Sequence, residues 1–123
     1  MILLDTNAVL WALAGSPRAA PLTTLGPSLR LSPVSLLEIS FLVEVGKIEL
    51  IAGRSVAEIA DDARWQLDSP SSGRLFTAAL DLDWTRDPFD RLLVAHARYR
   101  RWRFATGDRQ LQRRLDPDAL FVL

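Results

Sequence analysis

The feature that most constrains the fold is the alternation of short, largely apolar segments with longer stretches of helical periodicity. Residues 2–4, 29–31, 103–106 and 120–123 are too short for helices and fit buried strands. Strands that alternate with helices favour an α/β fold, in which a mostly parallel β-sheet is flanked by helices. Such a sheet brings the ends of its strands to one edge, where α/β proteins bind ligands.

The segments between these strands carry helix signals. Ser32 followed by proline is an N-cap with proline at the first helical position, which predicts a helix over residues 33–45. Ser55 and Glu58 form a capping box, which predicts a helix over residues 55–67. Further helices are expected at residues 8–14, 75–82 and 109–115 and from residue 88 onward, and turns at residues 15–28.

Length and composition predict one globular domain over residues 1–123. Hydrophobic residues make up 49% of the chain and charged residues 24%, and cysteine is absent, which excludes disulfides and thiolate metal sites. No apolar run approaches the roughly 20 residues of a membrane span, and no export signal is visible. We therefore expect a cytoplasmic protein with no membrane-bound part.

Arginine is concentrated near the C-terminus, although the formal net charge is zero. The fork of an arginine side chain donates paired hydrogen bonds to phosphate. The candidates for phosphate contact are Arg98, Arg100, Arg101 and Arg109. A solvated helix face explains the same charges equally well.

Glu38 occupies an unexpected position on the helix predicted for residues 33–45. Ser40, Glu44 and Lys47 mark the solvent face by their spacing, and Glu38 lies on the opposite side, followed by Phe41 at i+3. A carboxylate on an apolar face is costly unless it is paired or bound to a metal. A buried ion pair, or a position at the edge of the face, is the alternative.

Two aspartates stand at the start of the helix that begins near residue 88. Asp87 fits the N-cap, with proline after it, and is explained by the fold alone. Asp90 is followed at helical spacing by Leu93 and Val94 and therefore leans toward the buried side, while Arg91, Ala95 and Arg98 are expected to face solvent. We assign Asp87 to the fold and Asp90 to the chemistry.

Two more acids are expected at the same edge of the sheet. Asp5 ends the first strand, and Asp108 follows residues 103–106 by two positions, so both would emerge at the carboxyl edge. Oxygen donors without cysteine suit Mg²⁺ or Mn²⁺ better than zinc. His96 is more simply a satisfied core residue, and no serine–histidine pair or phosphate-binding glycine loop is visible in the sequence.

These motifs resemble those of the PIN-domain nucleases, and among them the VapC-type ribonuclease toxins of bacterial toxin–antitoxin pairs. The similarity covers essentially the whole chain in order. The matching segments are LLDTNAVLW with Asp5, SPVSLLEISFLVEVGKIEL with Glu38, DPFDRLLVAHA with Asp90, and FATGDRQL with Asp108.

The resemblance implies a Mg²⁺- or Mn²⁺-dependent endoribonuclease that leaves 5′-phosphate and 3′-hydroxyl ends. It implies that Asp5, Glu38, Asp90 and Asp108 hold the metal, and that Asn7 and Thr106 support these carboxylates. It also implies an RNA substrate, a homodimer, and an antitoxin partner whose peptide blocks the acidic site.

Two other functions remain compatible with the residues. A catalytically silent PIN-like module could bind RNA or a protein without turnover, although none of the four acids is missing. A phosphatase with an aspartyl nucleophile usually carries a second aspartate two residues after the first, and Asn7 stands at that position.

Overall fold

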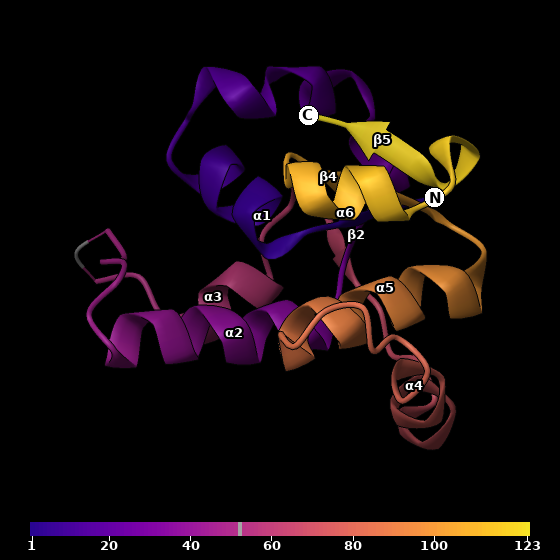
Figure 1. Ribbon diagram of the computed structural model, residues 1–123. Helices are drawn as coiled ribbons and strands as arrows, with labels where there is room; N and C mark the ends of the chain where they lie inside the picture. Colours follow the sequence, from indigo (N-terminus) through magenta and orange to yellow (C-terminus); the bar gives the residue numbers. More distant parts are fainter. Residues whose placement is uncertain (52) are drawn as a thin grey trace.

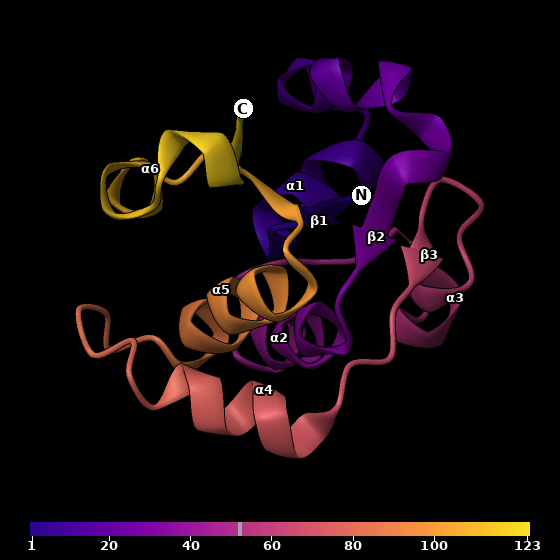
Figure 2. The ribbon, with the colours of Figure 1, turned by 90° about the vertical axis from the view of Figure 1, so that its right-hand side faces the viewer.

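The computed structural model describes residues 1–51 and 53–123. In this part of the chain, five strands form one parallel sheet in the order β3-β2-β1-β4-β5. Figure 1 labels β2, β4 and β5, and Figure 2 labels β1, β2 and β3. The strands are β1 (Ile2–Leu4), β2 (Leu29–Leu31), β3 (Gln66–Leu67), β4 (Arg103–Thr106) and β5 (Leu120–Val122). The α/β class and the parallel sheet predicted from the sequence are confirmed.

Helices connect the strands, and most begin within two or three residues of the predicted positions. They are α1 (Thr6–Leu13), α2 (Pro33–Glu44), α3 (Val56–Ala60), α4 (Ser72–Ala79), α5 (Pro88–Arg100) and α6 (Arg109–Arg114), with 3₁₀ turns η1 (Pro17–Thr24), η2 (Gly26–Ser28) and η3 (Pro117–Ala119). The segment expected to form turns is therefore largely 3₁₀ helix. Within the described ranges, no helix has the length and apolar character needed to cross a membrane.

Both faces of the sheet are covered, so successive residues of a strand enter different hydrophobic clusters. Ile2 and Leu4 pack with residues of α1, η1 and α3, whereas Leu3 packs with residues of α4, α5 and α6. This is the period-two alternation of a strand, with both sides buried as is usual for parallel sheets. Figure 2 shows α2, α4 and α5 lying together.

The helix predicted for residues 55–67 is wrong in its second half. The capping box is present, since Ser55 Oγ accepts a hydrogen bond from Glu58 N (3.2 Å), but α3 ends at Ala60. Residues 66–67 instead form β3, which pairs with the edge of β2. Trp65 is buried and donates its indole N–H to the Ile59 carbonyl (2.8 Å). Pairing with a distant strand and burial of a large aromatic side chain outweigh local helix propensity here.

The predicted solvent face of α5 is also partly wrong. Ala95 is buried, and it lies within a run of buried residues from Leu93 to Ala97. The reason is that α4 packs against α5 and covers the side that the helical wheel leaves for water. A helical wheel assumes that a helix packs on one side only, whereas α5 packs on two sides.

His96 is the satisfied core histidine that the sequence predicted. Its ring is buried, with Nδ1 2.8 Å from Ser32 Oγ and Nε2 2.7 Å from Asp68 Oδ2. Burial lowers the pKa of His96 although Asp68 opposes the shift, so the neutral ring accepts from Ser32 and donates to Asp68. Arg100 donates to both oxygens of Asp68 (2.8 and 3.1 Å). Burial alone would raise the pKa of Asp68, but these bonds outweigh it and lower that pKa.

This serine–histidine–aspartate arrangement could not be predicted from the sequence, because Asp68, Ser32 and His96 come from three separate segments. Its order matches that of a hydrolase triad. However, Ser32 is fully buried, and its hydroxyl oxygen is the N-cap acceptor for Val34 N (3.2 Å). The group therefore has a structural role: it ties α2, α5 and the segment after β3 together.

Replacing Asp68 with Ala would leave His96 Nε2 and the Arg100 guanidinium without their shared acceptor. We expect the free energy of unfolding to fall by about 1–3 kcal/mol, measured by urea denaturation at pH 7. Asp81→Ala is the matched control, because Asp81 is exposed and makes no side-chain hydrogen bond to a described residue. It should change stability by less than about 0.5 kcal/mol. Equal losses in the two variants would contradict the structural role.

Candidate functional site

Parallel pairing places Asp5 and Asp108 at the same edge of the sheet. β1 and β4 are neighbours in register, with Leu4 opposite Ala105, and Asp5 N extends the ladder by donating to the Ala105 carbonyl (2.9 Å). Asp5 is therefore fixed at the carboxyl end of β1, and Asp108 follows the carboxyl end of β4. Each residue is also the N-cap of the next helix, α1 or α6.

Thr106 links these two acids directly. Its hydroxyl donates to Asp5 Oδ2 at 2.6 Å and accepts from Asp108 N at 3.0 Å. Asp5 is 5% exposed, so its carboxylate depends on this contact and on the Thr6 N–H (2.7 Å) for hydrogen bonds. The Thr106 hydroxyl thus orients the Asp5 carboxylate and also fixes the backbone at Asp108.

Glu38 comes to the site from α2. Its side chain is half-buried, and its Oε1 atom is buried with no hydrogen-bond partner among the described residues. The prediction that its helix face is apolar core is wrong in part, because Phe41 and Val45 are exposed and Ile39 is the buried neighbour. Glu38 lies at the boundary between core and solvent, where the surrounding residues bury part of its side chain and leave the rest accessible.

The first turn of α5 supplies two acids. Asp87 is the predicted N-cap, with Oδ1 accepting from Phe89 N (2.8 Å) and Asp90 N (3.2 Å). Asp90 is half-buried and leans toward the core as predicted, since Leu93 and Val94 behind it are buried. Both carboxylates thus stand at the N-terminus of one helix, where the helix dipole favours negative charge.

Burial raises the pKa values of Asp5, Glu38 and Asp90, and the charges of neighbouring acids add to the rise. Burial raises the pKa of Asp5 to about 6, and the charges of Asp108 and Asp87 add to the shift. Burial also raises the pKa of Asp90 to about 7, and four further charges reinforce it, those of Asp87, Asp5, Glu38 and Asp108. The pKa of Glu38 is raised by burial as well. Acids from four parts of the chain therefore share one electrostatic environment.

The sequence missed the contribution of Asp87 to this environment. Among the charged neighbours of Asp90 and Glu38, Asp87 contributes most to raising their pKa values. A cap and the third helical residue lie within one turn, so their proximity could have been read from the sequence. The N-cap role accounts for Asp87 by itself, so nothing in the sequence required an electrostatic role.

The donor set fits a hard divalent cation. Every acid gathered here offers carboxylate oxygen. The buried Oε1 atom of Glu38 has no hydrogen-bond partner among the described residues, although the Thr6 hydroxyl is near enough to oppose the rise in the pKa of this carboxyl group. In the described part of the chain, no group of three or more acidic, histidine or cysteine side chains is positioned to hold a metal ion as it stands. A bound cation would offset the repulsion between the carboxylates.

Other residues proposed from the sequence are not all near the acids. Asn7 is exposed in α1, and its side chain makes no hydrogen bond to a described residue. Arg100 is held by Asp68, and Arg98 and Arg101 lie about 12 Å or more along α5 from the acids at its start. Arg109 directly follows the last acid. The roles of these five residues stay predictions.

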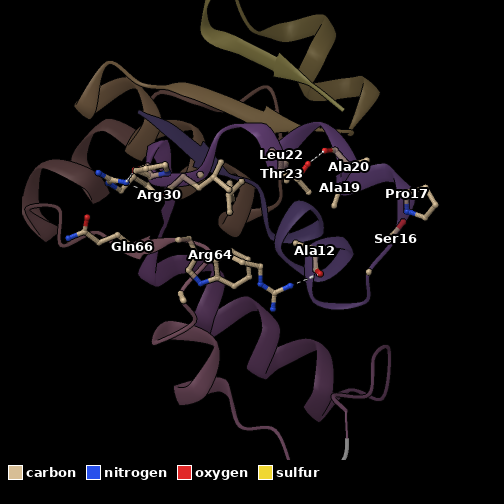
Figure 3. A pocket seen from close by; sticks show the side chains of 17 residues that line it. Ala12, Ser16, Pro17, Ala19, Ala20, Leu22, Thr23, Arg30, Arg64 and Gln66 are labelled. Carbon is tan, nitrogen blue, oxygen red and sulfur yellow. Dashed lines mark hydrogen bonds between the residues drawn. The ribbon is translucent and has the colours of Figure 1, made fainter.

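A separate cavity of about 840 Å³ lies between α1, η1, β2 and the segment before β3 (Figure 3). Its lining is largely apolar and includes Leu4, Leu22 and Trp65. Figure 3 shows Arg64 extending to the carbonyl of Ala12, with Nη1 and O 2.7 Å apart. None of the five acids lines this cavity, so it is distinct from the acidic site.

The fold and the acidic edge agree with the result of a comparison with protein families. Residues 2–116 match the model of the PIN domain, and the chain therefore belongs to the PIN domain family. A comparison with curated proteins gave no match.

Solved structures share the fold. A toxin–antitoxin complex from Klebsiella pneumoniae has a TM-score of 0.70 at 14% identity, covering 99% of this chain and 97% of that one. VapBC2 from Rickettsia felis, bound to a DNA fragment from its promoter, has a TM-score of 0.65 at 18% identity, covering 100% and 98%. FitAcB from Neisseria gonorrhoeae has a TM-score of 0.52 at 22% identity, covering 88% of each chain.

The raised pKa values predict how stability depends on pH when metal is removed. Because Asp5 and Asp90 have folded-state pKa values of about 6 and about 7, against about 4 when unfolded, the folded state binds more protons between these limits. Stability in EDTA should therefore fall as pH rises from about 4 to about 7. Asp90→Asn should weaken this dependence and raise the melting temperature at pH 8.

Thermal melts of the two proteins across this pH range, in EDTA, would test the prediction. Asp81→Asn removes an equal charge from an exposed position and serves as the control. Because the lowered pKa of His96 acts in the opposite direction in both the wild type and Asp90→Asn, the difference between them isolates Asp90. If the melting temperatures of wild type and Asp90→Asn change with pH in the same way, Asp90 is not crowded as described.

Proposed function

We propose that this protein is a metal-dependent endoribonuclease and the toxin of a toxin–antitoxin pair. The observation that carries the proposal is the convergence of carboxylates from β1, α2, α5 and the β4–α6 loop, with a buried Glu38 oxygen left unpaired. Unsatisfied buried acceptors are rare unless a site serves a function. Membership of the PIN domain family and the resemblance of DPFDRLLVAHA and FATGDRQL to toxin motifs point to the same activity.

In this proposal Asp5, Glu38, Asp90 and Asp108 hold Mg²⁺ or Mn²⁺. When bound, such an ion polarises a phosphoryl oxygen and provides a water-derived nucleophile at neutral pH. Hydrolysis would leave 5′-phosphate and 3′-hydroxyl ends. Asp108 uses Oδ1 to cap α6, so its second oxygen remains for a ligand.

The chain's own residues supply order to the site. Thr106 fixes the Asp5 carboxylate through the 2.6 Å hydrogen bond, which limits the movement that a metal must induce. The hydroxyls of Thr6 and Ser35, 2.9 Å apart, join the first turns of α1 and α2, which keeps Glu38 close to Asp5. Asn7, in the first turn of α1, would help to orient the carboxylates once RNA or metal is present.

Protein partners are supported by exposed apolar side chains. Leu37 on α2 is 66% exposed, and Phe76 and Leu80 on α4 are 59% and 72% exposed. Exposed apolar groups that gather on a surface mark contact sites. Two of the solved structures with this fold are described as toxin–antitoxin or VapBC assemblies. We propose a homodimer that also binds an antitoxin.

A silent PIN-like module that binds RNA or a protein is the competing function. It shares the fold, so the acids distinguish the two. In a nuclease, an unpaired buried carboxylate oxygen can serve as a metal ligand. In a silent module it has no such use.

The proposed activity predicts that the purified chain cleaves RNA from a mixed panel in Mn²⁺, with the products followed on denaturing gels. Cleavage should disappear in EDTA, and Asp90→Asn should reduce it at least about 100-fold, because a group that orients metal and water is lost. Asp87→Ala should lose about 0.5–2 kcal/mol of stability as a missing cap, while retaining most activity per folded molecule.

Identical purification of all variants controls for contaminating nuclease. Equal activity losses for Asp87→Ala and Asp90→Asn, per folded molecule, would defeat the assignment of the two aspartates. A folded wild-type chain that cuts no RNA and binds no Mn²⁺ by calorimetry would favour the silent module.

A further prediction concerns self-association, measured by sedimentation equilibrium. If the exposed apolar residues form the dimer contact, Leu37→Asp or Leu80→Asp should raise the dimer dissociation constant about tenfold or more, since a buried charge costs at least 1.4 kcal/mol. The exposed substitution Glu44→Gln is the control. A wild-type chain that stays monomeric at high concentration would refute the homodimer.

A further inference from the structure

Arg18 lies closer to an aromatic ring than any other arginine in the described part of the chain, and it does so beside the acidic edge. Its guanidinium carbon lies 3.8 Å from the centroid of the Trp11 ring. Trp11 belongs to α1 and Arg18 to η1, so the stack joins the two elements that follow β1. Pro17 and Ala19, on either side of Arg18, line the apolar cavity, whereas the Arg18 side chain does not.

Gly107 shows where this stack lies. A Cβ atom at Gly107 would be 2.5 Å from Trp11 Cη2 and 2.9 Å from Arg18 Nη2, closer than real side chains allow. Both side chains therefore pack against the backbone between Thr106 and Asp108. Allowing for one Cα–Cβ bond and one Cα–Cα step, Arg18 Nη2 is at most about 8 Å from the Asp108 Cα.

The hydrogen-bond donors of Arg18 are available. Its backbone N–H binds Ser16 Oγ, but its guanidinium makes no hydrogen bond or ion pair with a described residue, and the residue is exposed. Arg64 and Arg100, which also lie over aromatic rings, are both engaged by carboxylates. Arg103 and Arg114 lie farther from their rings, at 5.3 and 5.9 Å. Arg18 thus combines an ordered position with an unused donor fork.

We propose that Arg18 binds a phosphate of the RNA strand adjacent to the one that is cut. This inference rests on the proposed function. A cluster of five carboxylates repels RNA, and a fixed cation at its rim offsets that field where the strand must pass. Stacking on Trp11 holds the guanidinium plane, so its paired N–H groups can meet two phosphate oxygens.

The test is RNA binding by fluorescence anisotropy, with a labelled random-sequence single-stranded RNA and Asp90→Asn as the background that prevents cutting. Adding Arg18→Ala should raise the dissociation constant about tenfold. It should also reduce the slope of log affinity against log salt by about 0.7, the value for one lost contact to a single strand. Arg74→Ala, which removes an exposed arginine from α4, is the matched control and should leave both unchanged.

Cleavage kinetics add a readout that a structural defect would not imitate. Arg18→Ala in the otherwise wild-type chain should raise KM with kcat nearly unchanged, because the contact is made equally before and during the reaction. Arg18→Lys keeps the charge without the fork and should recover only part of the loss. Trp11→Leu should weaken binding in the presence of Arg18 and add little to Arg18→Ala, since it acts through that residue.

The outcomes separate this inference from the proposed function. If the wild-type chain cuts RNA but Arg18→Ala binds with the same affinity and salt slope, the role of Arg18 is overturned and the nuclease stands. If Arg74→Ala loses as much affinity as Arg18→Ala, general charge replaces the specific contact. If the wild-type chain neither cuts nor binds RNA, both proposals fall.

Discussion

The parallel pairing of β1 with β4 is the constraint on which the acidic edge depends. These strands are about a hundred residues apart in the chain, and their register places Leu4 opposite Ala105. One residue further on, Asp5 N still reaches the Ala105 carbonyl, and Thr106 reaches the Asp5 carboxylate. A shift of one residue would turn Thr106 to the other face of the sheet, and the two acids would lose their shared hydroxyl.

Electrostatic repulsion at this edge is a cost that the rest of the fold offsets. Carboxylates with raised pKa values destabilise a folded protein at neutral pH. The hydrophobic clusters on both faces of the sheet supply the opposing free energy, and the neutral His96 joins α2 to α5 by hydrogen bonds rather than by adding charge. The acidic edge is thus held at a cost in stability, and groups with strongly shifted pKa values are typical of functional sites.

The places of most of the acids in the fold could be predicted from the sequence because these residues are tied to local signals. Asp5 and Asp108 follow strands, Asp87 and Asp90 open a helix, and each position can be read from a few neighbouring residues. Burial was harder to predict. The helical wheel puts Glu38 on an apolar face, which is partly exposed in the structure, and puts Ala95 in solvent, although Ala95 is buried. The reason is that a helical wheel contains no information about what covers each face.

The sequence by itself determined the strands of the sheet apart from β3, the helix caps and the order of the acids, since these depend on hydrogen bonds and periodicity within one turn or one strand. Only the tertiary structure decided that residues 66–67 join the sheet, that Ser32, His96 and Asp68 meet, that Asp87 acts on Glu38, and that Arg18 lies beside Gly107. The physical reason is that such contacts depend on strand register and on which helix covers which face, which short-range propensity does not specify.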